Sequence, residues 1–101
     1  MAIQGYITLT LEVFPEGKRL VSRCRELGVT SCGSDVAAAF ENLKDSITTY
    51  LNAIEKLGDR GRVFAEKGIA IRKTKPRTIS VEFVNLPPNS YASGYVLPIA
   101  A

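Results

Sequence analysis

The chain has 101 residues, of which 46% are hydrophobic and 23% are charged, a composition typical of one soluble globular domain. It contains no histidine, which excludes Ser-His-Asp and Cys-His catalysis and every histidine-ligated metal site. No segment resembles a signal peptide, and no apolar run is long enough for a membrane helix. We therefore expect a cytoplasmic protein that holds no cofactor.

The first third of the chain predicts a three-stranded antiparallel meander. Residues 3–14 alternate apolar with polar side chains, which is the pattern of a half-buried strand. The turn Pro15-Glu16-Gly17 leads to a second strand over residues 19–25. A further turn at Gly28 leads to a short third strand over residues 29–32.

A long helix is predicted after the meander. Ser34 or Asp35 is a suitable N-cap, because its side-chain oxygen can accept a hydrogen bond from the first turn. From Val36 to Leu57, apolar residues recur at alternating steps of four and three, which forms one continuous stripe along a helix. Gly58 is placed to end this helix.

The second half of the chain is less regular. We expect a loop over residues 58–62, a short strand or turn over residues 63–67, and a short strand over residues 68–71. A polar linker over residues 73–76 then leads to a strand over residues 78–84.

Apolar side chains near the C-terminus favour contacts beyond a simple meander and helix. The tail over residues 85–101 is too apolar to hang free in water, so packing or another chain must hold it. A meander with one helix also leaves strand edges uncovered, which favours a homo-oligomer, most simply a dimer. The predicted oligomer contacts are Ile79, Val81, Phe83, Tyr91, Tyr95 and Leu97.

Positive charge is concentrated in residues 60–77, which carry seven basic residues and one acidic residue, whereas the rest of the chain is net negative. Such a segment can be a solvated connector, an oligomer contact, a docking site for a protein or a nucleic-acid footprint. The arginines of the second strand add a cationic sheet face, which is either solvated or docks an acidic partner or RNA. The candidate surface residues are Arg19, Arg23, Arg25, Arg60, Arg62, Lys67, Arg72, Lys73, Lys75 and Arg77.

Four carboxylates are candidates for acid–base or metal chemistry, namely Glu12, Glu16, Glu26 and Asp35. Glu12 falls on the polar face of the first strand near the arginines of the second, so a cross-strand ion pair is the plainer interpretation. The other three belong to a turn, a strand end and a helix cap. We therefore expect no enzymatic activity.

The two cysteines flank the turn at Gly28. A hairpin centred on that glycine makes Cys24 and Cys32 cross-strand neighbours within disulfide range. A register shift of one residue places them on opposite faces of the sheet. We expect two free thiols, because a cytoplasmic protein keeps its thiols reduced.

The stretch from Tyr6 to Leu57 resembles the HicB-like antitoxin family of bacterial and archaeal toxin–antitoxin pairs. The resemblance rests on the acidic-glycine turn at 16–17, on the glycine turn and short strand at 28–35, and on the helix segment 38–51. In that helix, four residues match the family pattern EA-x-x-N-x-x-x-A-I-x-x-Y-L, namely Asn42, Ile47, Tyr50 and Leu51. The resemblance implies a partial ribonuclease-H-like fold without nuclease residues.

Three departures from the family pattern stand beside the matches. Residues 24–28 replace a Pro-x-x-Pro-Gly-like segment and keep only its glycine, and the acidic residue that usually precedes the helical alanine is missing at 36–38. No ribbon-helix-helix or helix-turn-helix domain follows residue 60. The last difference matters because antitoxins that repress their own promoter carry such a domain.

The predicted fold is α+β: a three-stranded antiparallel meander, one long helix packed on it, and a C-terminal strand region. Residues 1–101 form a single domain, with a HicB-like β-β-β-α core over 1–58 and a basic connector, strand and apolar tail over 59–101. The predicted function is that of a non-enzymatic HicB-like protein, an antitoxin or orphan relative, that binds a second copy of itself or a small toxin. The alternative is a small nucleic-acid-binding module that uses residues 60–77.

Overall fold

The alternating N-terminal segment forms one long strand, β1 (Ile3–Glu16), in a computed structural model that describes residues 3–77 and 86–100. Strand β2 (Arg19–Cys24) returns antiparallel beside the second half of β1. Strand β3 (Thr30–Gly33) then returns beside β2. The predicted three-stranded meander is confirmed, with each strand boundary within two residues of its expected position.

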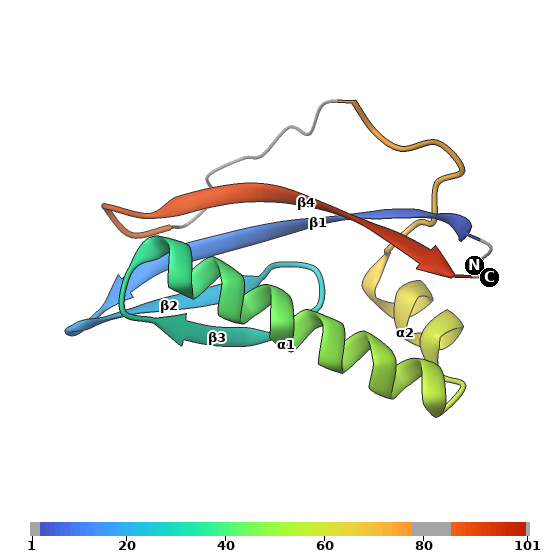
Figure 1. Ribbon diagram of the computed structural model, residues 1–101, viewed down its shortest axis with the longest axis horizontal. Coiled ribbons are helices and arrows are strands. Elements are labelled where there is room, and N and C mark those ends of the chain that lie inside the picture. The colour runs from blue at the N-terminus through green and yellow to red at the C-terminus, as the bar shows by residue number, and fades with distance from the viewer. Residues whose placement is uncertain (1–2, 78–85, 101) are drawn as a thin grey trace.

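A fourth strand, β4 (Tyr91–Ala100), pairs with the other edge of β1, so the strand order is β3-β2-β1-β4. Ile7 lies opposite Leu97, and Val13 lies opposite Tyr91. Figure 1 shows β1 and β4 running side by side along the length of the molecule. The apolar tail is therefore held by packing within its own chain, which is one of the two alternatives that the sequence left open.

The long helix α1 (Val36–Lys56) covers one face of the sheet, over β1, β2 and β3. Its N-cap is Asp35, whose carboxylate accepts a hydrogen bond of 2.7 Å from the amide of Ala38. Leu57 is the C-cap, and Gly58 adopts a left-handed φ of 73° directly after it. The cap, the length and the end of this helix were all predicted from the sequence.

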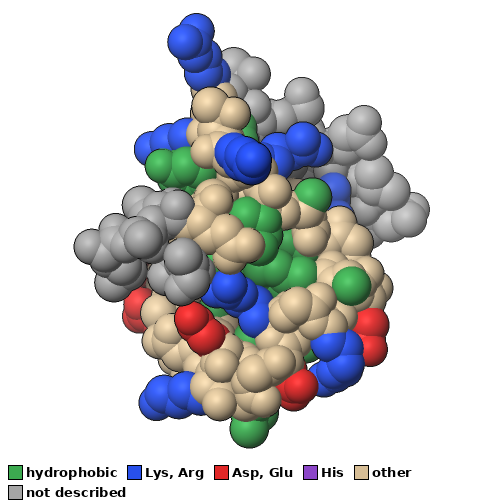
Figure 2. All heavy atoms as spheres, turned by 90° about the vertical axis from the view of Figure 1, so that its right-hand side faces the viewer, with side chains coloured by type: hydrophobic (Ala, Val, Ile, Leu, Met, Phe, Trp, Pro, Cys, Tyr) green, Lys and Arg blue, Asp and Glu red, His purple; other side chains and the backbone are tan. Residues whose placement is uncertain are grey.

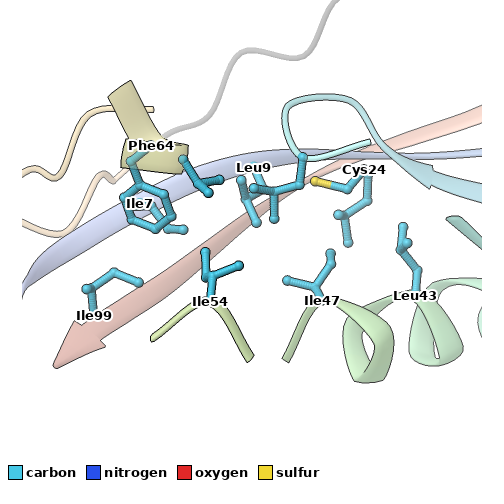
Figure 3. Close-up of a cluster of buried hydrophobic side chains, with 11 residues drawn as sticks. Ile7, Leu9, Cys24, Leu43, Ile47, Ile54, Phe64 and Ile99 are labelled. Atoms are coloured by element: carbon cyan, nitrogen blue, oxygen red, sulfur yellow. The ribbon is translucent and has the colours of Figure 1, made fainter. Parts of the chain in front are cut away.

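The core lies between α1 and the sheet. Alternate residues of β1 point toward the helix, and Ile7, Leu9 and Val13 are fully buried. Figure 3 shows Leu43 and Ile47 of α1 facing this layer. The stripe predicted along the helix is the face that packs on the sheet. Burial of side chains of this size contributes about 1.5–3 kcal/mol each, so this contact is a main source of stability.

A short second helix, α2 (Arg60–Lys67), was not predicted. The sequence favoured a loop over residues 58–62 and a strand or turn over 63–67, and both interpretations are wrong. Val63 and Phe64 are buried against the core, and Gly68 ends the helix with a φ of 68°. An eight-residue helix is too short to show a repeated apolar stripe, so its sequence pattern resembles that of a short strand.

Residues 68–71 do not form the short strand expected of them. The chain instead makes one isolated bridge to β1, in which Tyr6 and Arg72 exchange backbone hydrogen bonds of 2.7 and 2.8 Å. Gly5 permits this approach, because a Cβ there would lie 2.5 Å from the carbonyl oxygen of Arg72. The strand expected over residues 78–84 lies outside the described residues.

The predicted pairing of the two cysteines is wrong. Val21 lies opposite Cys32 and Arg23 lies opposite Thr30, so the turn is centred nearer Glu26 than Gly28. Cys24 points into the core and Cys32 is exposed on the opposite face, and both thiols are free. Leu27 accounts for the register, because its side chain is buried in the core and draws the turn toward the helix.

Candidate interaction surfaces

The face of the sheet away from α1 holds a cluster of charge around Glu12. The carboxylate of Glu12 is 1% exposed and accepts hydrogen bonds from Arg23 at 3.1 Å and from Arg25 at 2.6 and 3.1 Å. Each arginine also forms an ion pair with it, at 3.0 and 2.6 Å respectively. One buried carboxylate therefore binds two of the three sheet arginines that the sequence placed on a cationic face.

The remaining contacts of these arginines are also within the chain. The guanidinium of Arg23 lies 5.1 Å from the ring centroid of Phe14, a cation–π arrangement. Arg19 is exposed at the start of β2, opposite Glu16. The predicted cationic face is thus much weaker than its sequence suggests, because Glu12 offsets one of its charges and holds two side chains in place.

The other three carboxylates also have structural positions. Glu26 accepts hydrogen bonds from the amide and hydroxyl of Thr10, at 2.7 and 2.8 Å, and so closes the loop after β2 onto β1. Asp35 caps α1, and Glu16 ends β1 beside the hairpin turn. Among the residues that the structure describes, no group of three His, Cys, Asp or Glu side chains could hold a metal ion.

The basic segment divides into two parts. On α2, Arg60 pairs with Glu55 at 3.6 Å, and Arg62 pairs with Asp59 at 3.4 Å and with Glu66 at 3.1 Å. The two acidic partners of Arg62 raise its pKa further. Lys67 is exposed at the end of the helix. The positive charges of α2 are therefore largely paired with neighbouring acids.

The connector after α2 carries the exposed part of the basic segment. Its four basic side chains are all exposed: Arg72, Lys73, Lys75 and Arg77. Figure 2 views the end of the molecule that carries α2, and several Lys and Arg side chains gather in its upper half, while the Asp and Glu side chains lie in its lower half. The structure thus places four basic groups close together along one stretch of exposed backbone.

The predicted oligomer contacts fall in two places. Tyr91, Tyr95 and Leu97 all belong to β4, whereas Ile79, Val81 and Phe83 lie outside the described residues. The side chain of Tyr91 is 50% exposed, while Tyr95 and Leu97 are half-buried against the core cluster. The ring of Tyr95 also carries the ammonium of Lys44 at 5.2 Å from its centroid.

The hydrogen-bonding pattern of β1 shows which backbone groups of β4 face away from β1. The carbonyl of Thr10 accepts the amide of Arg25, and Tyr6 bonds Arg72, so even-numbered residues of β1 direct their backbone groups away from β4. Because these groups alternate along an antiparallel ladder, odd-numbered residues of β1 face β4. The register Ile7 to Leu97 then makes the odd-numbered residues of β4 face β1.

It follows that the even-numbered residues of β4 direct their backbone groups outward. Ala92, Gly94 and Val96 each present an amide and a carbonyl, while Pro98 presents only a carbonyl. Within the described residues, β4 pairs only with β1. The ten residues of the strand include no charged side chain. Long edge strands normally carry charges or bulges that prevent pairing with another chain.

The fold and these surfaces define an α+β protein whose four-stranded antiparallel sheet is covered on one face by a long helix. None of the helices in the described part of the chain is long and apolar enough to span a membrane. Comparisons with protein-family models, with curated proteins and with solved structures gave no match to this chain.

Proposed function

We propose that the protein is a non-enzymatic HicB-like protein, an antitoxin or an orphan relative, that acts by binding another protein chain. The observation that carries the proposal is β4, a ten-residue strand without charged side chains that pairs with β1 alone among the described residues. The outward-facing backbone groups of such a strand can pair with an added strand of a partner, with main-chain hydrogen bonds giving affinity and alternate side chains giving specificity. The order of three strands followed by a long helix is the one that the HicB-like resemblance implies.

The mechanism is occlusion. A folded surface of this protein covers the RNA-binding face of a small toxin, and no covalent bond is made or broken. A cytoplasmic location belongs to the same proposal, since both thiols are free and thiols stay reduced in that compartment.

The test is co-expression with any short basic reading frame that adjoins this gene. Expression of that frame alone should arrest growth, and co-expression of this protein should relieve the arrest and yield a complex of the two chains at a fixed ratio. Arrest that persists at equal expression of both chains would contradict the antitoxin function. If no such frame arrests growth, the orphan alternative is tested by light scattering of the full chain over a range of concentrations, and a mass of 11.0 kDa at every concentration would contradict self-binding.

A second candidate function is nucleic-acid binding, and a separate observation favours it. The four basic side chains from Arg72 to Arg77 are exposed on one stretch of backbone, unlike the paired arginines of α2. If this stretch binds phosphates, affinity for RNA or DNA should fall steeply with salt. The variant K73Q/K75Q should then reduce the slope of log K against log salt by about one per lost phosphate contact.

The matched control for that experiment is Arg62→Gln. Arg62 belongs to the same basic segment but already pairs with Asp59 and Glu66. Its loss should leave the salt slope unchanged if the connector binds the nucleic acid. No salt-dependent binding to either RNA or DNA at about 50 mM salt, where phosphate contacts are strongest, would exclude this candidate.

A further inference from the structure

We infer that Asn42 closes the outer edge of β3 to strand addition and so restricts which part of the sheet a partner strand can use. The inference rests on the proposed binding of another chain through the sheet, and it adds a specificity-determining residue to that binding. Among the described strands, β3 is the outermost on its side, in the order β3-β2-β1-β4. An edge strand whose backbone groups are available can pair with a strand of another molecule.

The hydrogen bonds between β2 and β3 show which backbone groups of β3 face away from β2. The amide of Cys24 donates to the carbonyl of Val29, just before β3, at 2.8 Å. The antiparallel register continues along β3, and hydrogen-bonded pairs recur at every second residue of such a ladder, so Ser31 also faces β2. The outward backbone groups of β3 are therefore those of Thr30 and Cys32.

The side chain of Asn42 already occupies one of these outward groups. Its Nδ2 donates a hydrogen bond of 2.9 Å to the carbonyl of Cys32. An added antiparallel strand needs both the amide and the carbonyl of each outward residue, because each hydrogen-bonded pair exchanges two bonds. With the carbonyl of Cys32 occupied, only Thr30 offers both groups, and a single pair is too little to hold an added strand.

The position of Asn42 follows from the close packing of α1 on β3. Ala39 and Leu43 are fully buried against the sheet, and Asn42 lies one turn after Ala39, at the border of the buried face of the helix. A Cβ on Gly33, the last residue of β3, would lie 2.7 Å from Cα of Ala39. The helix therefore lies close enough to the strand for a short side chain to reach its carbonyl.

The hydrogen bond of Asn42 is not required to satisfy a buried group. Thr30, Cys32 and Asn42 are all exposed, so water can reach this corner of the molecule and bind the carbonyl in place of Asn42. Strand β3 itself carries no charged side chain and no proline, which are common means of keeping an edge strand from pairing. Asn42 supplies the protection that the strand's own residues lack.

The first experiment compares self-association of the wild-type full chain and of Asn42→Ala by sedimentation over a range of concentrations. In the variant, two copies can pair edge to edge around an axis at Ser31, with Thr30 of one copy opposite Cys32 of the other. Each copy regains one carbonyl, so we expect the association constant to rise by about tenfold to a hundredfold. The matched control is Thr48→Ala, which removes a side-chain hydrogen bond made within α1 and should leave association unchanged.

Cross-linking tests whether the new contact lies at β3. In that pairing, the two Cys32 side chains are diagonal neighbours about 7–8 Å apart, and Cys32 is an exposed free thiol. A short bis-maleimide should therefore couple two copies of Asn42→Ala faster than two wild-type copies. Asn42→Gln keeps an amide donor and should return coupling to the wild-type rate. The double variant Asn42→Ala/Cys32→Ser should give no coupled product, because Cys24 is buried.

The unfolding midpoint of each variant separates this role from a structural one. Alanine is a strong helix former and the position is exposed, so Asn42→Ala should fold. A lower midpoint with wild-type association and wild-type cross-linking would give Asn42 a structural role only and overturn the inference. Stronger association without faster coupling through Cys32 would place the new contact away from β3 and would also overturn it.

These outcomes can be separated from failure of the proposed function. If the wild-type chain relieves toxin arrest while Asn42→Ala associates no more strongly than the wild type, the antitoxin function stands and the inference on β3 fails. If Asn42→Ala associates through Cys32 as expected but the wild-type chain gives no relief from arrest, the inference stands and the antitoxin function fails.

Discussion

Glu12 and Arg25 form an ion pair of 2.6 Å in which the carboxylate is 1% exposed and the guanidinium side chain is 35% exposed. Because the carboxylate is buried while its partner is partly hydrated, loss of the acid and loss of the arginines should have unequal effects on stability. Loss of the carboxylate leaves two guanidiniums that can still reach water, whereas loss of both arginines would leave a buried charge. The acid is therefore the residue around which this side of the sheet is organised.

Replacement Glu12→Gln should destabilise the fold. It removes both ion pairs and leaves a buried amide in their place. We expect the free energy of unfolding to fall by about 1–3 kcal/mol, since the arginines can rehydrate. In urea denaturation, the variant should unfold at a lower midpoint concentration, with an unchanged slope of the unfolding free energy against urea concentration. The control is Glu41→Gln, which breaks the exposed pair with Lys44 and should change stability by less than about 0.5 kcal/mol. Equal effects of the two substitutions would contradict the assigned position of Glu12.

Replacement Ser22→Ala should have the opposite sign. The hydroxyl of Ser22 is fully buried under α1 and has no hydrogen-bond partner among the described residues. Removal of an unpaired buried hydroxyl relieves its desolvation cost, so we expect the free energy of unfolding to rise by about 0.5–1.5 kcal/mol. Thermal unfolding measures it as a raised midpoint. Ser31→Ala, on the neighbouring strand, should have little effect, and a clear loss of stability in Ser22→Ala would show that the hydroxyl is hydrogen-bonded.

Replacement Gly33→Ala should separate β3 from α1. A Cβ on Gly33 would lie 2.7 Å from Cα of Ala39, and backbone of a helix cannot move aside cheaply. We expect this overpacking to lower the free energy of unfolding by about 1–3 kcal/mol. At Gly61, in α2, an added Cβ meets nothing within 4 Å, and Gly61→Ala should stabilise the helix by about 0.5–1 kcal/mol. The denaturation midpoints of the two variants are each compared with that of the wild type. Equal shifts in both midpoints would contradict the close contact between β3 and α1.

The two thiols should differ in reactivity by orders of magnitude. Cys32 is exposed, whereas Cys24 is buried and burial raises the pKa of its thiol to about 11. Since the thiolate is the nucleophile, a thiol reagent at neutral pH should label Cys32 quickly and Cys24 only on unfolding. Mass spectrometry of the labelled protein checks this, with Cys32→Ser as the variant that removes the fast reaction. Fast labelling of both thiols would contradict the register of β2 and β3.

The raised pKa of Cys24 also makes stability depend on pH. The unfolded chain ionises this thiol at its ordinary pKa of 9.0, below the value of about 11 in the folded protein. The stabilisation is therefore complete below pH 9 and is lost as pH rises toward 11, by up to roughly 2–3 kcal/mol. Cys24→Ala should lose less stability than wild type between about pH 8 and pH 10.5. An identical decline in both proteins would show that other groups cause it.

The sequence was sufficient for the elements whose pattern is local. Residues along β1 and α1 repeat at the periods of a strand and a helix over many positions, and Asp35 and Gly58 mark the ends of α1 by their own chemistry. The ion pairing of Glu12 could also be anticipated, because strand alternation places it on the same face as Arg23. These predictions needed only neighbours along the chain or across one hairpin.

The sequence was insufficient for features that depend on contacts between residues far apart in the chain. Strand β4 could not be recognised as a partner of β1, because nothing in residues 91–100 specifies which edge they join. The register of the cysteines depends on the burial of Leu27, and α2 depends on the burial of Phe64. The weakened cationic face also depends on such contacts. The sequence shows how many arginines the second strand carries, but it does not show that Glu12 binds both Arg23 and Arg25.

The pairing of β1 with β4 joins the two ends of the described chain, and this has a consequence for the order of folding. The meander and α1 are made of contacts between nearby segments, which form early during synthesis. The long ladder on the other edge of β1 cannot form until β4 has been synthesised. Until then the residues of β1 from Ile3 to Val13 have no strand partner on that side. A nascent chain of this protein is therefore most exposed to wrong strand partners before β4 emerges, and a chaperone at that stage should matter most for its yield.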